Sequence, residues 1–255
     1  MKRKLWITIA LCVYLCMSMA ACGEQQSEET APADDSAWQA AYLETLQADE
    51  DAILPYERNG EAGLVALSDL NGDDTPELLY FVMDEATEFP AMKIYTFRDG
   101  TAQEVSYEKP LACTEYSDLP ADALYDYQLQ GGSDYQVFLN GDGTLVMYSL
   151  LYGAESNPGM VNEYRMNADG NLEEICRFGF VDGDTTATFW KDGMEISREE
   201  YLSLCDEAVS DVNELIFCQK RTTVGYNHDA KLWDATDGMD YAGMSYDQAV
   251  AELGE

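Results

Sequence analysis

The chain has 255 residues, 46% of them hydrophobic, and it carries 49 Asp and Glu residues against 14 Lys and Arg. Its formal charge of −35 argues against nucleic acid as a partner, because nucleic-acid binding depends on neutralising phosphates with Lys and Arg. The same charge disfavours docking on anionic lipid head groups and favours loose attraction of divalent cations, although an acidic surface also serves solubility alone.

The N-terminus has the order of residues found in secretion signals. Lys2, Arg3 and Lys4 precede an apolar run over residues 5–21 that ends in small residues, so we expect residues 1–21 to be a signal peptide. An uncleaved transmembrane anchor is the alternative, because about 18 apolar residues can span a bilayer. Both interpretations place the rest of the chain on the extracytoplasmic side of the membrane.

The junction Met19-Ala20-Ala21-Cys22 resembles the lipobox of bacterial lipoproteins, with methionine where leucine is usual. This resemblance implies that the Cys22 thiol carries a diacylglycerol thioether and that cleavage leaves Cys22 as the mature N-terminus. Acyl chains, palmitate among them, would then anchor the protein stably, because each buried methylene contributes about 0.8 kcal/mol. The membrane is therefore an expected partner, through the lipid anchor.

The segment that follows, residues 23–36, is polar and acidic and has almost no apolar side chains. It cannot bury enough surface to offset its chain entropy, so we expect residues 22–36 to be a lipidated N-terminus and a disordered tether. We expect residues 37–255 to form a single extracytoplasmic domain. Without the three cations of the leader, 11 Lys and Arg oppose 49 Asp and Glu, and the net charge becomes −38.

The first expected element of this domain is an amphipathic helix over residues 37–48. Apolar side chains recur there at helical spacing behind Asp35 and Ser36, either of which can cap the N-terminus. From Gly63 the chain changes to short runs rich in Val, Leu, Ile, Tyr, Phe and Thr, which are typical of strands. The expected strands are residues 64–67, 78–83, 92–97, 136–139, 144–151, 162–166, 172–180 and 186–190.

Several of these strands are joined by turn sequences at residues 98–101, 140–143, 167–170 and 191–193. Each contains an Asp-Gly pair, which supplies the positive φ angles of tight hairpin turns. Two helices are expected after the strands. One opens at Ser197 with Glu200 in the capping-box position, and the other covers residues 246–253 behind Ser245 and Gln248. The predicted fold is α+β: an antiparallel meander of about six to nine strands, with one N-terminal and two C-terminal helices packed on it.

An acidic loop at residues 69–77 has the pattern of a calcium site. Its oxygen-bearing side chains fall at alternate positions, and calcium binds six to eight oxygens that a tightly turning loop can direct at one point. The predicted ligands are the side chains of Asp69, Asn71 and Asp73, the backbone carbonyl of Thr75, and Glu77 either directly or through water. A surface turn whose carboxylates merely face water is the alternative.

Two positions of the acidic loop depart from a helical EF-hand. Asp74 stands where glycine normally allows the sharp turn, and Tyr80 stands where the bidentate glutamate is usual. The residues after the loop also have the pattern of a strand rather than of an exiting helix. We therefore expect an EF-hand-like loop between strands, whose ligand set is completed by other parts of the fold.

Residues 66–79, which include the run Asp69-Leu70-Asn71-Gly72-Asp73, together with the preceding helix, resemble a group of uncharacterised lipoproteins and secreted proteins of gut Firmicutes. These proteins share a helix followed by a "DLNGDGxPELL" loop between strands. The likeness covers about residues 37–105, and residues 193–201 are similar to a recurrent piece more loosely. It implies an exported location and calcium binding, and it implies no substrate.

Four cysteines remain in the extracytoplasmic part, namely Cys113, Cys176, Cys205 and Cys218. They permit two disulfides in three connectivities, between which the sequence does not choose. Small buried thiols are the alternative, because free cysteine is among the most buried residue types. The chain has no CxxC pair, so it offers neither a redox motif nor a zinc knuckle.

The single histidine, His228, limits the available chemistry. Histidine-rich zinc sites are excluded, and a Ser-His-Asp triad lacks the GxSxG elbow that would supply its serine. The sequence has no phosphate-binding GxxxxGK[ST] or GxGxxG loop. We expect His228, in a polar stretch, to be a solvated loop residue.

These exclusions favour a non-catalytic, surface-anchored binding or scaffolding module with no specified ligand. Trp190, Trp233, Tyr226 and Tyr241 offer flat faces to a glycan or a protein ligand, or else they pack in the core, as aromatic side chains at strand and helix spacing usually do. The alternative is an extracellular glycoside hydrolase that uses two carboxylates, or a glycan-binding accessory protein. With 49 acids, the sequence nominates no catalytic pair.

Overall fold

The computed structural model describes residues 36–57, 64–84, 89–107, 133–151, 156–183, 187–219 and 228–255. The predicted signal peptide, the lipidation residue Cys22 and the tether up to residue 35 lie outside these ranges, as do Cys113 and Tyr226. Contacts group Trp38–Glu255 into one unit, and the fold below is that of this unit. Within the described ranges, no helix is long and apolar enough to cross a membrane.

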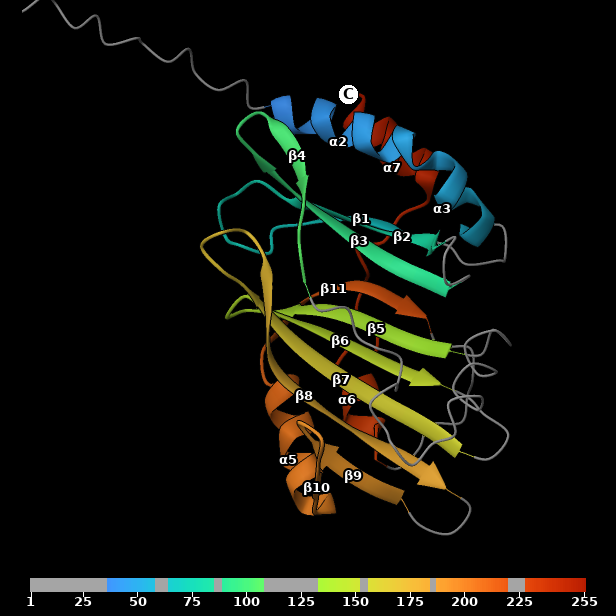
Figure 1. Cartoon of the computed structure of the whole chain (residues 1–255), viewed down its shortest axis with the longest axis vertical. Helices are drawn as coiled ribbons and strands as arrows, with labels where there is room; N and C mark the ends of the chain where they lie inside the picture. The colour runs from blue at the N-terminus through green and yellow to red at the C-terminus, as the bar shows by residue number, and fades with distance from the viewer. Residues whose placement is uncertain are drawn as a thin grey trace, which may run out of the picture. The chain divides into compact units, whose positions relative to one another are not determined.

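Two consecutive helices come first along the chain (Figure 1). Helix α2 (Ala37–Ala48) has the predicted bounds, and its side chains Tyr42 and Leu46 are fully buried. Helix α3 (Glu50–Glu57) was not predicted, because Pro55 interrupts a helical pattern in the sequence. It starts behind Asp49, whose carbonyl accepts hydrogen bonds from the N–H groups of Ala52 and Ile53.

A small antiparallel sheet follows, with its strands in sequence order. Its strands are β1 (Val65–Ser68), β2 (Glu77–Asp84), β3 (Phe89–Arg98) and β4 (Thr101–Glu104). One face packs on α2, α3 and the C-terminal helix α7 (Tyr246–Leu253) in a common apolar core. The opposite face directs Ala66, Leu79 and Ile94 into a second core. This alternation is the period of two expected of strands that are covered on both faces.

The larger sheet has seven strands in the order β10-β9-β8-β7-β6-β5-β11, and all neighbours are antiparallel. Its strands are β5 (Ser133–Asn140), β6 (Thr144–Leu151), β7 (Ser156–Met166), β8 (Leu172–Gly183), β9 (Ala187–Lys191), β10 (Met194–Ile196) and β11 (Val212–Gln219). Strands β5 to β10 form a meander, and β11 returns beside β5 after helix α5 (Arg198–Ala208).

The two faces of the larger sheet are buried by different partners. Helix α5 and the short helix α6 (Ala230–Asp234) pack on one face, where Phe138, Phe178 and Tyr201 are fully buried. The other face shares its core with the small sheet, through side chains such as Leu145 and Phe217. The two sheets therefore pack together, with helices on the outer face of each.

A C-terminal strap, defined here as residues 239–245, joins the edges of the two sheets. Tyr241 forms a β-bridge with Leu215 of β11, and Met244 forms one with Val65 of β1. The Met244 N–H donates to the Val65 carbonyl at 2.7 Å, and the Val65 N–H donates back at 3.1 Å. Helix α7 begins directly after the strap, with the predicted capping box between Ser245 and Gln248.

The predicted α+β class is confirmed, as is the helical start at Ser197, whose side chain accepts a hydrogen bond from the Glu200 N–H. The described strands number eleven and divide between two sheets, whereas one meander of about six to nine was expected. The additional strands are β4, β10 and β11. Strands β4 and β10 are too short to show alternating apolar and polar residues in the sequence. Strand β11 follows a helix, and no glycine turn before it indicates that a strand begins.

Candidate metal site in the acidic loop

The acidic loop connects β1 to β2, whose last paired residues are Ser68 and Glu77. Its turns are made possible by two residues in the left-handed region, Gly72 at φ 76° and Asp74 at φ 68°. Asp74 is thus the non-glycine residue that the sequence placed at the sharp turn, and it adopts the required conformation. Asp and Asn tolerate this region better than other residues with a side chain, although at some cost.

The side chain of Asp69 organises the loop. Its Oδ1 accepts hydrogen bonds from the N–H groups of Gly72 at 2.7 Å and Asp73 at 3.2 Å, and its Oδ2 accepts one from Asp74 at 3.1 Å. Asn71 Oδ1 accepts from the Asp73 N–H, and Asp73 Oδ1 accepts from the Thr75 N–H, each at 2.8 Å. The side-chain oxygens at alternate positions are therefore held by the amides of the loop itself.

Glu77 has a different environment from the other acids of the loop. Its side chain is 1% exposed, and both carboxylate oxygens already have donors. Oε1 accepts from Asn71 Nδ2 at 2.9 Å and from Thr96 Oγ1 at 3.0 Å, while Oε2 accepts from the Leu70 N–H at 2.8 Å. Glu77 therefore holds the acidic loop to strands β2 and β3.

Burial raises the pKa of the Glu77 carboxyl to about 7, from an ordinary value of 4.5. The hydrogen bonds from Leu70 and Thr96 oppose this rise, and the nearby charges of Asp73 and Asp69 add to it. Desolvation is the largest of these effects, because a carboxylate loses its hydration when it is buried. At neutral pH the group is consequently close to its midpoint of titration.

The donor set of the loop fits a hard cation in part. Asp69, Asn71 and Asp73 provide side-chain oxygens and Thr75 a carbonyl, which are the ligand types that calcium prefers. An ionised carboxylate oxygen that accepts one amide hydrogen bond keeps a lone pair for a metal. Glu77 has less to offer, because Oε1 already accepts two hydrogen bonds and only Oε2, which accepts from the Leu70 N–H alone, keeps a lone pair.

Two further observations bear on the predicted ligand set. In the described part of the chain, no group of three or more His, Cys, Asp or Glu side chains is gathered closely enough to hold a metal ion. Tyr80, at the usual glutamate position, is fully buried and donates its hydroxyl to Asp49 Oδ2 at 2.7 Å. The position of Tyr80 therefore supplies no carboxylate.

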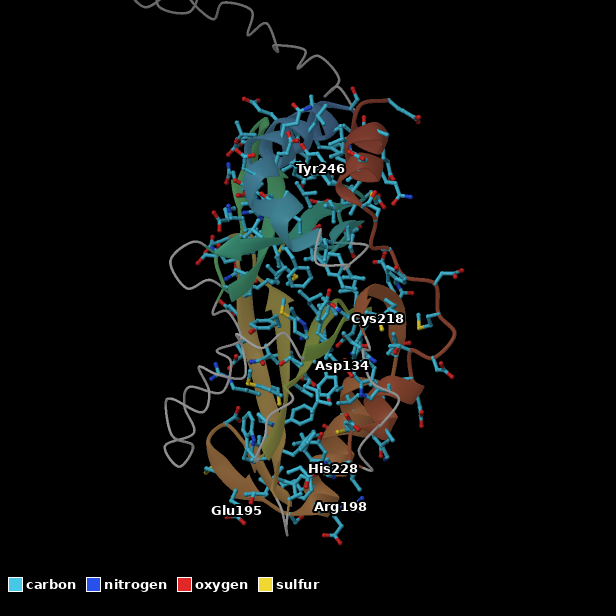
Figure 2. All side chains as sticks on the ribbon, turned by 90° about the vertical axis from the view of Figure 1, so that its right-hand side faces the viewer. Asp134, Glu195, Arg198, Cys218, His228 and Tyr246 are labelled. Carbon is cyan, nitrogen blue, oxygen red and sulfur yellow. The ribbon has the colours of Figure 1, made fainter. Side chains whose placement is uncertain are left out.

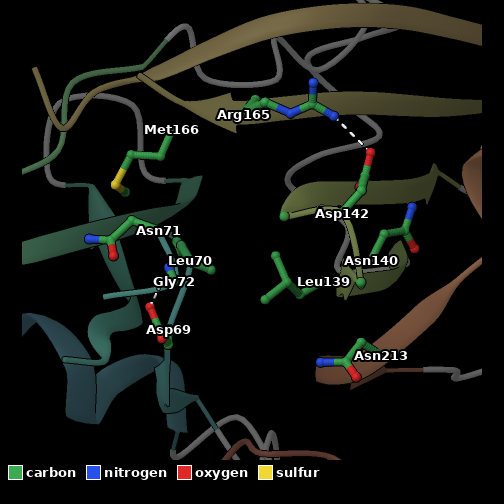
Figure 3. A pocket seen from close by; sticks show the side chains of 12 residues that line it. Asp69, Leu70, Asn71, Gly72, Leu139, Asn140, Asp142, Arg165, Met166 and Asn213 are labelled. Atoms are coloured by element: carbon green, nitrogen blue, oxygen red, sulfur yellow. Dashed lines mark hydrogen bonds and ion pairs between the residues drawn. The ribbon is translucent and has the colours of Figure 1, made fainter. Parts of the chain in front are cut away.

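A cleft of about 430 Å³ adjoins the acidic loop. Figure 3 shows Asp69, Asn71 and Gly72 on one side of it, and residues of the β5–β6 turn and of β11 on the other. Arg165, near the end of β7, also lines the cleft and forms an ion pair with Asp142 of that turn at 2.8 Å. The sequence identified the turn at residues 140–143 but not its position opposite the loop, because that depends on how the two sheets pack.

The structure corrects the expectation for His228 and bears out core packing for Trp190 and Trp233. His228 was expected to be solvated, yet its side chain is 12% exposed and its ring lies 4.3 Å from that of Phe180, centre to centre. Trp190 and Trp233 are each 6% exposed, so neither presents a flat face to a ligand. Tyr241, in the strap, is 45% exposed, so it is an aromatic side chain on the surface.

The cysteines of the described residues are thiols. No disulfide joins any two of Cys176, Cys205 and Cys218, and Cys205 is fully buried. Burial raises the pKa of the Cys205 thiol to about 11, which leaves it protonated and unreactive at neutral pH. The alternative of small buried thiols is therefore the correct one for Cys205.

Comparison with known proteins supplies no relative for this chain: no protein-family model matches it, and no curated protein matches it. The resemblance to gut lipoproteins therefore stays a prediction, and the function has to be argued from the residues themselves.

Proposed function

We propose that this protein is a lipoprotein anchored to the extracytoplasmic face of the bacterial membrane, and that it acts as a non-catalytic binding or scaffolding module stabilised by calcium. The observation that carries the calcium proposal is the arrangement of the acidic loop. Its oxygens at alternate positions are held by the loop amides, with Gly72 and Asp74 in the left-handed conformations that such a loop needs.

Calcium would be held by the side chains of Asp69, Asn71 and Asp73 and by the Thr75 carbonyl, with water in the remaining positions. Glu77 would act as the fixed base of the loop, because its three hydrogen bonds tie the loop to β2 and β3. A metal with this partial protein ligand set should bind in the weak extracellular range, with a dissociation constant of about 10⁻⁴–10⁻³ M.

Thermal melting of the full chain in mild detergent tests the calcium site. At about 5 mM calcium and a dissociation constant near 0.5 mM, binding adds about 1.4 kcal/mol to the free energy of unfolding. For a domain of this size the melting temperature should rise by roughly 3–5 °C relative to chelator. Asp69→Ala removes one ligand and three hydrogen bonds to loop amides, so it should abolish the calcium-dependent rise.

Asp169→Ala is the matched control, because Asp169 is an exposed acid in another glycine-containing turn. It should keep the full calcium shift. An absent shift in the unaltered protein, or a shift that persists in Asp69→Ala, would refute the site. Magnesium at the same concentration separates a calcium site from general screening of the acidic surface, since Mg²⁺ demands a near-ideal octahedron that this loop does not offer.

The lipid anchor rests on the leader and on Cys22, which only the sequence supports. Labelling of growing cells with radioactive palmitate should mark the unaltered protein and should fail to mark Cys22→Ala. Unchanged labelling of Cys22→Ala would defeat this part of the proposal.

The cleft beside the acidic loop is a candidate surface for binding within the described residues. Its volume of about 430 Å³ suits a small ligand, and it combines apolar Leu139 and Met166 with polar Asn213 and Arg165. Asn213→Ala and Arg165→Ala are therefore the variants to compare in a screen of glycans and peptides. Both lie outside the metal ligands, so a loss of binding would not be confused with a loss of calcium.

A further inference from the structure

The side-chain amide of Gln136 is an unpaired polar group inside the larger sheet. Gln136 lies on β5 and is 0% exposed, and neither its Nε2 nor its Oε1 has a hydrogen-bond partner among the described residues. Protein interiors pair nearly all of their buried polar atoms, with water or an ion where no protein group is at hand. The amide therefore calls for a partner other than the side chains that the structure describes.

A second unpaired atom belongs to Asp229, which is also 0% exposed. Its Oδ2 accepts hydrogen bonds from the Tyr148 hydroxyl at 2.8 Å and from Trp233 Nε1 at 3.1 Å. Its Oδ1 is buried and has no partner in the described part of the chain. A buried carboxylate satisfied on one oxygen alone is costly, so the free oxygen also indicates a missing donor.

The side chain of Tyr148 brings the two unpaired groups together. Gln136 and Tyr148 are paired directly across strands β5 and β6, so their side chains leave the same face of the sheet. Gln136 and Tyr148 are therefore neighbours on this face, and the Tyr148 hydroxyl donates to Asp229 Oδ2. The unpaired atoms thus face one region, between the sheet and the residues that lead into α6.

The surroundings of this region are polar and ionisable. Asp134, two residues before Gln136 on the same face, is 1% exposed, and Cys218 is the cross-strand partner of Gln136 on β11. Figure 2 shows Cys218, Asp134 and His228 along the same side of the molecule. His228 directly precedes Asp229, and its ring packs against Phe180. An apolar guest would gain little among such groups.

We propose that Gln136, Tyr148 and Asp229 form an internal site for a small guest that carries a hydroxyl group. One O–H of the guest donates to Gln136 Oε1, a second O–H donates to Asp229 Oδ1, and a guest oxygen accepts from Gln136 Nε2. The guest therefore needs two O–H hydrogens, which water and a polyol both have. A bare metal cation cannot accept from Nε2, whereas a hydroxyl group both donates and accepts. The hydroxyl comes either from solvent water or from a small polyol, and the experiment below separates these sources.

Gln136→Met tests the site, because methionine has a similar length and removes both unpaired atoms. With a guest in place, the variant loses its hydrogen bonds and leaves Asp229 Oδ1 exposed to an apolar neighbour. Its melting temperature should fall by on the order of 2–4 °C. If no guest is bound, the variant removes an unpaired amide from the interior, and its melting temperature should stay the same or rise. That result would overturn the proposal.

Gln103→Met is the matched control, because Gln103 lies exposed on β4 and the same exchange there should leave the melting temperature nearly unchanged. A measurement on the unaltered full chain keeps the test valid if Gln136→Met fails to fold. The Gln136 amide protons should show a nuclear Overhauser effect to a long-lived water, or to glycerol carbon-bound protons when glycerol is added. A signal from water alone identifies solvent, and one from glycerol identifies a polyol. Absence of both would overturn the proposal.

Discussion

Between pH 5 and pH 8, the unaltered protein should lose about 2–3 kcal/mol of its free energy of unfolding relative to the Glu77→Gln variant. Burial raises the pKa of Glu77 to about 7. The folded protein therefore binds the proton more tightly than the unfolded chain does. Its free energy of unfolding falls as the pH rises from about 4.5 to about 7 and then levels off.

The magnitude follows from the two pKa values, about 7 in the fold and 4.5 as the ordinary value. Each unit of difference is about 1.4 kcal/mol, and most of the titration falls between pH 5 and pH 8. Glutamine is neutral at every pH, so the variant does not lose stability in this way. The glutamine NH₂ group faces at least one of the donors that now bond to the carboxylate, and this lost hydrogen bond costs about 1–3 kcal/mol at every pH.

Urea unfolding of both proteins, followed by tryptophan fluorescence in chelator, measures this difference at several pH values. Chelator is needed because a bound cation would lower the pKa of Glu77. Glu195→Gln, at an exposed position on β10, is the control and should show a constant gap from the unaltered protein. A gap for Glu77→Gln that stays constant from pH 5 to pH 8 would refute the argument that burial governs this carboxyl.

Three further outcomes are expected. Asp74→Gly should raise the free energy of unfolding, measured with urea, by about 0.5 kcal/mol. The reason is that φ is 68° at this position and glycine adopts this conformation without strain. A loss of stability would contradict the loop conformation. Gly179→Ala should lower the melting temperature sharply or prevent folding. An added Cβ would lie 2.2 Å from the Gly159 carbonyl oxygen and 2.4 Å from Trp190. A melting temperature within 1–2 °C of that of the unaltered protein would count against this packing. Burial lowers the pKa of His228, so the neutral ring is favoured in the fold and stability should fall as the pH drops through about 6.5. In urea unfolding at several pH values, His228→Gln should lose less stability than the unaltered protein as the pH drops. An equal loss in both proteins would assign the pH dependence to other groups.

Local signals in the sequence predicted the local parts of the fold. Ser197 and Ser245 each precede a helix that begins where the capping pattern indicated, because a cap is decided within four residues. The turn at residues 191–193 likewise joins β9 to β10, with Asp192 and Gly193 at positive φ. These features need no information from distant residues, and they were predicted correctly.

The division into two sheets is not a local property. Alternating apolar residues predict a strand, but they do not say which strand pairs with it. Strand β11 joins β5 across more than 70 residues, as in the pair of Leu215 and Phe138, and only the packed core decides this. The strap at Tyr241 and Met244 is likewise too irregular in sequence to be predicted.

The acidic loop shows the same limit at the level of one residue. The spacing of Asp69, Asn71 and Asp73 predicted the turn that the backbone makes, because side-chain to amide bonds form within the loop. Glu77 was predicted to bind the metal directly or through water, and the structure adds that its oxygens accept hydrogen bonds from Leu70, Asn71 and Thr96. Thr96 lies on the neighbouring strand β3, and that contact exists only once the sheet has formed.

A crystal structure of the protein grown in about 10 mM calcium tests the central claim most directly, since this concentration exceeds the expected dissociation constant. The account predicts one anomalous scattering peak inside the acidic loop, about 2.3–2.6 Å from oxygens of Asp69, Asn71, Asp73 and Thr75. Glu77 should keep its bond to the Leu70 N–H. A loop that holds only water under these conditions, with its amide hydrogen bonds unchanged, would contradict the claim that this protein is stabilised by calcium.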